Sequence, residues 1–287
     1  MEAAERWRRL VSERREADRL LGSKDDPATG SFWDRRAASY ATISSQTPRD
    51  PLVARIGRSV GPTTTVLDVG AGTGRITLPL AGRARKVTAV DPSPHMLAEL
   101  RRAAEQEGLS NIATVEGRWE DVDAPEADVT ICAHVLPMIE DASGFLAKLD
   151  RATRRRAFVC LRATGLDYLI DPLWRHFHGS SRRAGPSYLD AAAVLEELGV
   201  SPAIRMIEVP LMARFDDLDA AASFYRRALM IEGRGNDERE LRKLLSTWLV
   251  RRAGRLYPPA RRVPAALLMW SPRRYMSPTS IAPRSPK

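Results

Sequence analysis

The sequence predicts an α/β protein built on a doubly wound, seven-stranded, mostly parallel sheet with helical cap elements. Short β-branched or apolar runs alternate with amphipathic helical segments from residue 64 to residue 161. A glycine-rich turn separates the first of these runs from the helix that follows it. Hydrophobic residues make up 44% and charged residues 28% of the 287 positions, as in ordinary soluble domains.

Three helical segments precede the first strand. Residues 3–21 carry apolar side chains at roughly helical spacing among Arg and Glu. Residues 31–41 and 50–59 are predicted as shorter helices, the second with Pro51 in its first turn. We therefore expect residues 1–60 to form an N-terminal helical cap.

The alternating region follows this cap. Its predicted strands are residues 64–69, 86–90, 111–115, 128–132 and 156–161, and its predicted helices are residues 73–81, 94–106 and 142–152. Ser93 and Pro94 supply the cap and the first turn of the second of these helices. Parallel strands joined in this way have their carboxyl ends at one edge of the sheet, so ligand-binding residues are expected at that edge.

Beyond residue 162 the alternation is diluted. The expected elements are loop and short helix over 166–186, a helix over 188–198, strands at 203–210 and 263–270, and two amphipathic helices at 218–231 and 237–253. The helical pair thus lies between the last two strands. The predicted organisation is a main domain over 61–275, with an insertion at about 216–253, and a disordered basic tail over 276–287.

The net charge of +9 is unevenly distributed. Nine of the 45 basic residues and none of the 36 acidic residues lie in residues 251–287, so residues 1–250 are formally neutral. Such an end binds nucleic acid or another anion, or it is a solvated tail. The charged start is no secretory signal and no apolar stretch is long enough for a bilayer, so we expect a cytoplasmic protein without membrane contact.

The strongest local signal is VLDVGAGTGR, residues 66–75. Glycines at alternate positions let the backbone turn tightly and approach a ligand, and the next helix offers free N–H groups. A dinucleotide fingerprint fits poorly because Arg75 occupies its third glycine position, and the lysine of a phosphate-binding P-loop is absent. Asp91 ends the second strand, where it would accept hydrogen bonds from ribose hydroxyls.

These segments resemble the class I S-adenosylmethionine-dependent methyltransferases. VLDVGAGTGRITLPLA is similar to the first motif of that family, VTAVDPSPHMLAEL to the second, and VEGRWEDVDAPEADVTICAHVL to the third and fourth. The resemblance covers roughly residues 32–162 and is specific to the superfamily, not to a substrate. It implies a Rossmann-like fold and S-adenosyl-L-methionine as the cofactor.

The resemblance also implies cofactor-binding roles for individual residues. They are Asp68, Gly70, Ala71, Gly72, Asp91, Met96, Arg118, Trp119 and Ala133. The backbone of the glycine turn would surround the methionyl part with Asp68 beneath it, Asp91 would hold the ribose, and Met96 would pack on adenine. Arg118 and Trp119 stand where many relatives have Asp-Ala. Since Arg118 cannot accept a hydrogen bond from the adenine amino group, a main-chain contact at Trp119 is favoured, and its side chain is alternatively a core residue.

Two residues are candidates for the chemistry. His134 follows the fourth strand, where the methyl group would point, and it would remove a proton if the acceptor must lose one. Tyr40 lies in a segment similar to the entry helix of small-molecule members, whose Tyr is close to the sulfonium. Each has a structural alternative, His134 as a strand-end packing residue and Tyr40 as a helix-face aromatic. His176 and His178 are too sparse for a metal site, and their segment, with Trp174 and Phe177, is a better candidate for the acceptor pocket.

The leading hypothesis is a methyltransferase that modifies an oxygen or nitrogen atom of a small molecule, with the N-terminal helices and the insertion as a lid. One alternative is an RNA or protein methyltransferase that uses the basic C-terminal segment, although the neutral remainder of the chain disfavours nucleic acid. Another is a non-catalytic, cofactor-binding partner subunit. The acceptor and the oligomeric state are left undefined by these patterns.

Overall fold

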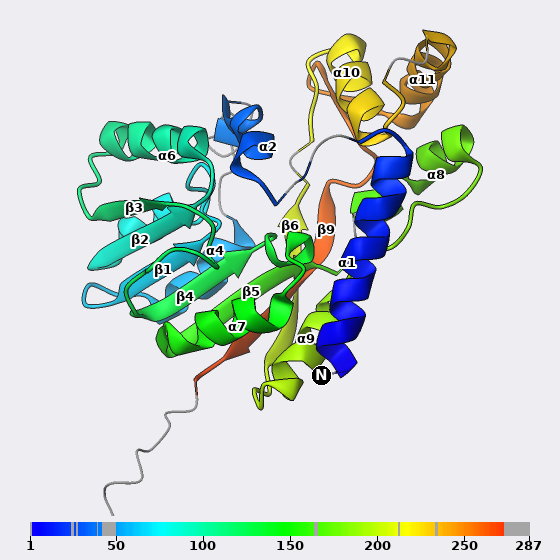
Figure 1. The fold of residues 1–287 in the computed structure, drawn as a ribbon. Coiled ribbons are helices and arrows are strands. Elements are labelled where there is room, and N and C mark those ends of the chain that lie inside the picture. The colour runs from blue at the N-terminus through cyan, green and yellow to red at the C-terminus, as the bar shows by residue number, and fades with distance from the viewer. Residues whose placement is uncertain are drawn as a thin grey trace, which may run out of the picture.

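The computed structural model describes residues 2–23, 26, 28–38, 40–41, 50–163, 166–211, 213–232 and 235–272. Its centre is a seven-stranded sheet of order β3-β2-β1-β4-β5-β9-β6 (Figure 1). The strands are β1 (Thr65–Val69), β2 (Lys86–Asp91), β3 (Ile112–Glu116), β4 (Ala127–Ala133), β5 (Thr153–Arg162), β6 (Ala203–Pro210) and β9 (Arg262–Trp270). Strands β1 to β5 pair in parallel, and β9 is antiparallel to both of its neighbours. The predicted seven-stranded, mostly parallel sheet is confirmed.

Helices cover both faces of this sheet. They are α1 (Glu2–Leu20), α4 (Pro51–Ile56), α5 (Thr77–Ala81), α6 (Pro94–Gln106), α7 (Ala142–Arg151) and α9 (Tyr188–Glu197), with short 3-10 helices at Gly57–Ser59 and Leu136–Met138. On one face α1, α7 and α9 bury Trp7, Phe145 and Leu195 in a common core. On the other face α4 and α5 bury Ile56 and Leu80 against the strands, and α6 lies beside α5 over β2 and β3.

Helix α1 is part of this core rather than a detached lid. The Trp7 side chain is fully buried, and its indole N–H donates to the carbonyl of Ile139 at 2.7 Å. Farther along the helix, Arg14 pairs with Asp167 at 2.9 Å. Asp18 in turn pairs with Arg182 at 2.8 Å. These ion pairs connect the second half of α1 to the segment that follows β5.

A second, smaller core lies beyond the carboxyl end of β5. It is formed by α8 (Leu166–His178), α10 (Leu218–Ala228), α11 (Gly235–Trp248) and the hairpin of β7 (Val250–Arg252) and β8 (Arg255–Tyr257). Its buried residues are Leu173, Trp174, Phe215, Ala221, Ala222, Tyr225, Leu229, Ile231, Leu241, Leu245, Leu249 and Leu256. We call this group the cap cluster. Figure 1 shows α10 and α11 standing apart from the sheet.

Some sequence-based boundaries are wrong. The segment 166–186 contains a 13-residue helix, α8, because its buried face packs in the cap cluster and outweighs the internal Pro172. The helix predicted over 237–253 ends at Trp248, and a hairpin follows in which Ala253 and Gly254 both have positive φ angles, 45° and 77°. The helix predicted from residue 73 begins at Thr77.

Two further expectations concern the C-terminal tail and contact with a membrane. The predicted tail over 276–287 lies outside the described residues. Within the part of the chain that is described, no helix has both the length and the apolar character that crossing a bilayer requires.

Candidate active site

The glycine turn joins β1 to α5 at the carboxyl edge of the sheet. Gly70, Gly72 and Gly74 have φ angles of 74°, 55° and 91°, a region that residues with a Cβ atom rarely adopt. The N–H groups of Gly70 and Ala71 donate to the carbonyl of Val90 at 2.8 and 3.1 Å, which ties the turn to the end of β2. A Cβ on Gly70 would overlap the side chain of Val135. A Cβ on Gly72 would meet nothing within 4 Å, so the turn is open there to a ligand.

Asp91 lies directly behind the open part of the turn. Its two carboxylate oxygens accept the N–H groups of Gly72 and Ser93 at 2.8 and 2.9 Å. Burial raises the pKa of Asp91, and these two hydrogen bonds oppose the rise. Each carboxylate oxygen keeps a second lone pair, so the side chain is held in place and can still accept hydrogen bonds from hydroxyl groups.

Asp68, near the end of β1, is a second buried carboxylate. The hydroxyl of Thr77 donates to one of its oxygens at 2.7 Å. Burial raises the pKa of Asp68 to about 6, against smaller opposing effects of Thr77 and Arg75. A cationic ligand at this position would lower that pKa and offset the cost of burying the ionised carboxylate.

The other residues implied in cofactor binding lie in different surroundings. Met96 is buried in the first turn of α6, and Ala133 ends β4 beside Cys160. Arg118 is half-exposed and pairs with Glu120 at 2.9 Å. The Trp119 ring is buried in the core, where its indole N–H donates to the carbonyl of Phe145 at 3.2 Å. The structural alternative for the Trp119 side chain is thus the arrangement observed.

His134 directly follows β4 at the same edge. Its φ angle is 64°, and its N–H donates to the carbonyl of Cys160 at 2.8 Å. The ring atom Nδ1 is buried without a hydrogen-bond partner in the structure. Burial lowers the pKa of His134 well below 6.5, and the cations Arg162 and Arg75 lower it further. The imidazole is therefore neutral at physiological pH.

The segment that carries Tyr40 lies over the start of α6. In α2 (Gly30–Asp34), the Asp34 carboxylate accepts from the Ser93 hydroxyl at 2.6 Å and lies 3.0 Å from Nδ1 of His95. Ser93 is the residue whose N–H binds Asp91, so α2 is anchored beside the open glycine turn. Tyr40 is 44% exposed, and its ring meets Trp33 edge-on at 5.7 Å. Sequence analysis did not single out Asp34, since its partners lie 59 residues away in the chain or more.

Arg162 is a further residue that sequence analysis missed. It ends β5, and its Nε atom is buried without a hydrogen-bond partner. Burial lowers the pKa of the guanidinium, as does the nearby charge of Arg75, while Tyr40 has the opposite effect. Arg75 itself pairs with the buried carboxylate of Asp50. The structure thus brings His134, Tyr40 and Arg162 to one edge of the sheet.

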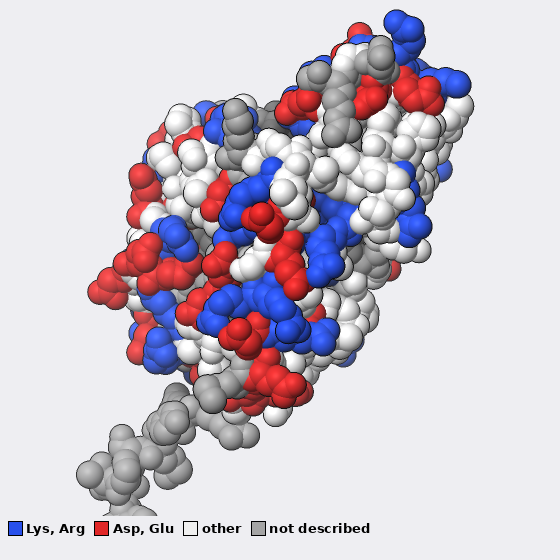
Figure 2. Space-filling model, turned by 45° about the vertical axis from the view of Figure 1, so that its right-hand side comes forward, with Lys and Arg blue, Asp and Glu red and all other residues white. Residues whose placement is uncertain are grey.

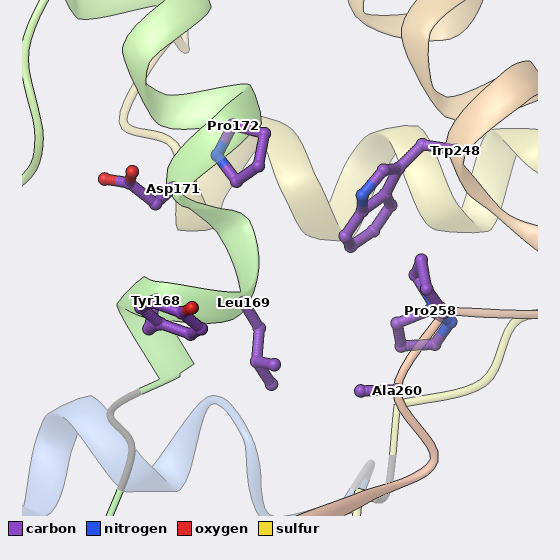
Figure 3. Close-up of a pocket in the computed structure, with 8 residues that line it drawn as sticks. Tyr168, Leu169, Asp171, Pro172, Trp248, Pro258 and Ala260 are labelled. Atoms are coloured by element: carbon purple, nitrogen blue, oxygen red, sulfur yellow. The ribbon is translucent and has the colours of Figure 1, made fainter.

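The segment proposed for an acceptor pocket lies at this edge, but different side chains face the cavity. Trp174 is buried in the cap cluster, and its ring stacks on His178. The His178 ring is hydrogen-bonded to the carbonyl of Leu229. Nε2 of His176 lies 3.5 Å from a carboxylate oxygen of Glu240. A groove of about 330 Å³ lies instead against the other side of α8. It is lined by Tyr168, Leu169, Asp171, Pro172, Trp248, Pro258, Pro259 and Ala260. Figure 3 shows α8 and the segment before β9 on opposite sides of it.

Comparisons with known proteins agree with this architecture. A family model described as a methyltransferase domain matches residues 66–156. The probable cobalt-precorrin-6B C(15)-methyltransferase (decarboxylating) of Methanothermobacter thermautotrophicus is 31% identical over 133 residues, which cover 39% of this chain and 67% of that protein. The ubiquinone biosynthesis O-methyltransferase of Methylocella silvestris is 28% identical over 164 residues, which cover 51% of this chain and 62% of that protein.

A solved structure matches the fold over a longer part of the chain. The YcgJ protein of Bacillus subtilis has a TM-score of 0.53 at 17% identity, and the match covers 77% of this chain and 97% of that one. The curated relatives, in contrast, are matched over about three fifths to two thirds of their lengths. From the family match, the sheet order and the glycine turn, the chain belongs to the class I S-adenosylmethionine-dependent methyltransferases.

Proposed function

We propose that the protein transfers a methyl group from S-adenosylmethionine to an oxygen or nitrogen atom of a small molecule. The observation that carries the proposal is the glycine turn with its two buried carboxylates. At Gly72 the backbone is open to a ligand, and Asp91 is held behind it by hydrogen bonds to two N–H groups. This is the position in an open α/β sheet at which a nucleoside binds.

The residues present fit the cofactor. Asp91 has free lone pairs for two ribose hydroxyls, and the buried carboxylate of Asp68 suits the ammonium group of the methionyl part. Gly72 leaves room for close approach by the ligand. When bound, S-adenosylmethionine supplies an electrophilic methyl group on a sulfonium.

The protein's own residues would orient the acceptor and manage its proton. His134, neutral at the end of β4, would accept a proton from a hydroxyl or ammonium acceptor. The segment with Tyr40, anchored through Asp34, would cover the site and exclude water. The acceptor's apolar body would lie along the groove beside α8, which is lined largely by apolar and aromatic side chains.

The small-molecule assignment is supported by the relatives and by the charge distribution. One of the relatives described above is named as an O-methyltransferase of ubiquinone biosynthesis, and the other as a probable C(15)-methyltransferase for cobalt-precorrin-6B, so both names refer to small molecules. On the face in Figure 2, basic and acidic side chains are interspersed and do not form a single basic surface. Within the basic C-terminal segment, Arg255 pairs with Asp216 at 3.0 Å and Arg262 donates to the carbonyl of Glu208 at 2.7 Å. Two of these arginines are therefore already engaged within the protein.

Calorimetric titration with S-adenosylhomocysteine tests the proposal. We expect micromolar binding by the wild type, no binding of NAD, and a loss of about tenfold or more in Asp91→Ala, because that change removes two charge-assisted hydrogen bonds to the ligand. Asp123→Ala, at an exposed carboxylate, serves as the matched control and should bind like the wild type. Absence of binding, or preference for NAD, would contradict the cofactor assignment.

A further inference from the structure

The described residues include only three buried side-chain atoms that lack a hydrogen-bond partner, and two of them lie at the candidate active site. The three are Nδ1 of His134, Nε of Arg162 and Nε of Arg226. Arg226 still pairs with Glu238 through another guanidinium nitrogen at 3.3 Å. His134 directly follows β4 and Arg162 ends the neighbouring strand β5, and the buried polar groups of a folded protein normally find partners.

The two residues are close together at the carboxyl edge. The His134 N–H binds the carbonyl of Cys160, which is two positions before Arg162. Side chains alternate along β5, so Arg162 lies on the same face of the sheet as Cys160, in the layer that includes α4. Arg75 lies on this side too, paired with Asp50, the N-terminal cap of α4.

The two arginines at this edge differ in their partners. Arg75 is neutralised by Asp50, whose carboxylate also accepts the N–H of Leu52 at 2.8 Å. Arg162, in contrast, forms no hydrogen bond or ion pair through its guanidinium with any residue that the structure describes. A charge that is partly withdrawn from water without a partner lowers stability, and a bound anion would offset that cost.

We infer that the methyl acceptor is a small carboxylic acid whose carboxylate binds the Arg162 guanidinium. The inference rests on the proposed function and adds the substrate class. A guanidinium matches the planar carboxylate through two parallel N–H donors. One guanidinium beside a neutral imidazole suits the single negative charge of a carboxylate. An acceptor held in this way would lie near His134, which follows the adjacent strand.

The test compares benzoate with its neutral isostere benzamide, on protein saturated with S-adenosylhomocysteine. Binding is measured by calorimetry and by the shift of the thermal midpoint. The variants are Arg162→Gln, Arg162→Lys and the control Arg156→Gln, which changes an exposed arginine near the other end of the same strand. In the wild type and the control we expect benzoate to bind about tenfold or more tightly than benzamide. In Arg162→Gln this preference disappears, and in Arg162→Lys it is reduced because the two-pronged contact is lost.

Several outcomes would overturn the inference. The first is an equal shift of the thermal midpoint with benzoate and with benzamide in the wild type, including no shift with either. The second is a preference for benzoate that survives in Arg162→Gln. Inorganic phosphate is the third probe, and stronger protection by phosphate than by benzoate would replace the carboxylate with a phosphate-bearing acceptor. Binding of S-adenosylhomocysteine distinguishes a failure of the proposed function from a failure of this inference. Failure of the wild type to bind it refutes the proposed function, whereas normal binding without carboxylate preference refutes this inference alone.

Discussion

The buried carboxylate of Asp68 should make the protein less stable at neutral pH than at mildly acidic pH. In the folded state burial raises the pKa of this side chain to about 6 from an ordinary value of 3.8. Above pH 6 the carboxylate is ionised in both the folded and the unfolded states, and the folded state bears the unfavourable burial of charge. Below pH 3.8 it is protonated in both states and the penalty vanishes. The penalty is therefore introduced as the pH rises from about 4 to about 6.

The size of the effect follows from the shift. A difference of about two pKa units corresponds to about 3 kcal/mol in the free energy of unfolding at pH 7.5, and to about half of that at pH 5. Asp68→Asn removes the ionisable group and keeps an oxygen that can accept the Thr77 hydroxyl. The variant should thus be more stable than the wild type by up to about 3 kcal/mol at pH 7.5, and the gain should shrink at pH 5.

Urea denaturation at the two pH values measures this difference, with Asp123→Asn as the control at an exposed carboxylate. The same variant should bind S-adenosylhomocysteine about tenfold or more weakly, since it has lost the negative charge opposite the ligand's ammonium group. Stability would rise while ligand binding falls. Equal stabilities of Asp68→Asn and the wild type at pH 7.5, with parallel pH dependence, would refute the assignment of a buried, ionised Asp68.

Further predictions concern the neighbouring positions. Gly70→Ala should destabilise the fold by about 2 kcal/mol or more, because a left-handed residue acquires a Cβ that overlaps Val135. Adding Val135→Ala should restore part of the lost free energy of unfolding, as measured by urea denaturation. If the double variant is no more stable than Gly70→Ala, the overlap is not the cause of the loss. His134→Gln should lower kcat by about a hundredfold or more and leave the affinity for S-adenosylhomocysteine unchanged, once an acceptor has been found with methyl-labelled cofactor. Near-normal turnover by His134→Gln would show that His134 is not the base. Since the pKa of His134 lies well below 6.5, wild-type kcat should show no inflection near pH 6.5.

The central sheet could be predicted because its determinants are local. Each strand from β1 to β5 is a short apolar run between recognisable helices and turns, and the three glycines of the first turn occupy positive φ angles. The elements after Arg162 depend more on tertiary contacts. Helix α8 tolerates Pro172 because Leu173 and Trp174 are buried in the cap cluster. The turn at Ala253 was overlooked because alanine rarely takes a positive φ angle.

The candidate site could be predicted only in part. The two carboxylates and the glycine turn lie within sequence motifs, so Asp68 and Asp91 were identifiable before their surroundings were known. The role inferred for Arg162 depends on the lack of a counter-ion near its side chain, and a sequence pattern cannot predict that lack. The anchoring of α2 through Asp34 similarly depends on a contact across the fold.

The two faces of helix α8 are under different evolutionary constraints. Residues such as Leu173 and Trp174 face the cap cluster, whereas Tyr168, Leu169 and Pro172 face the groove. Selection for a new acceptor can therefore act on the groove side while the interior of the cap and the sheet remain unaltered. We expect that orthologues with different acceptors diverge first at the groove-facing positions, and that the cap interior and the glycine turn change more slowly.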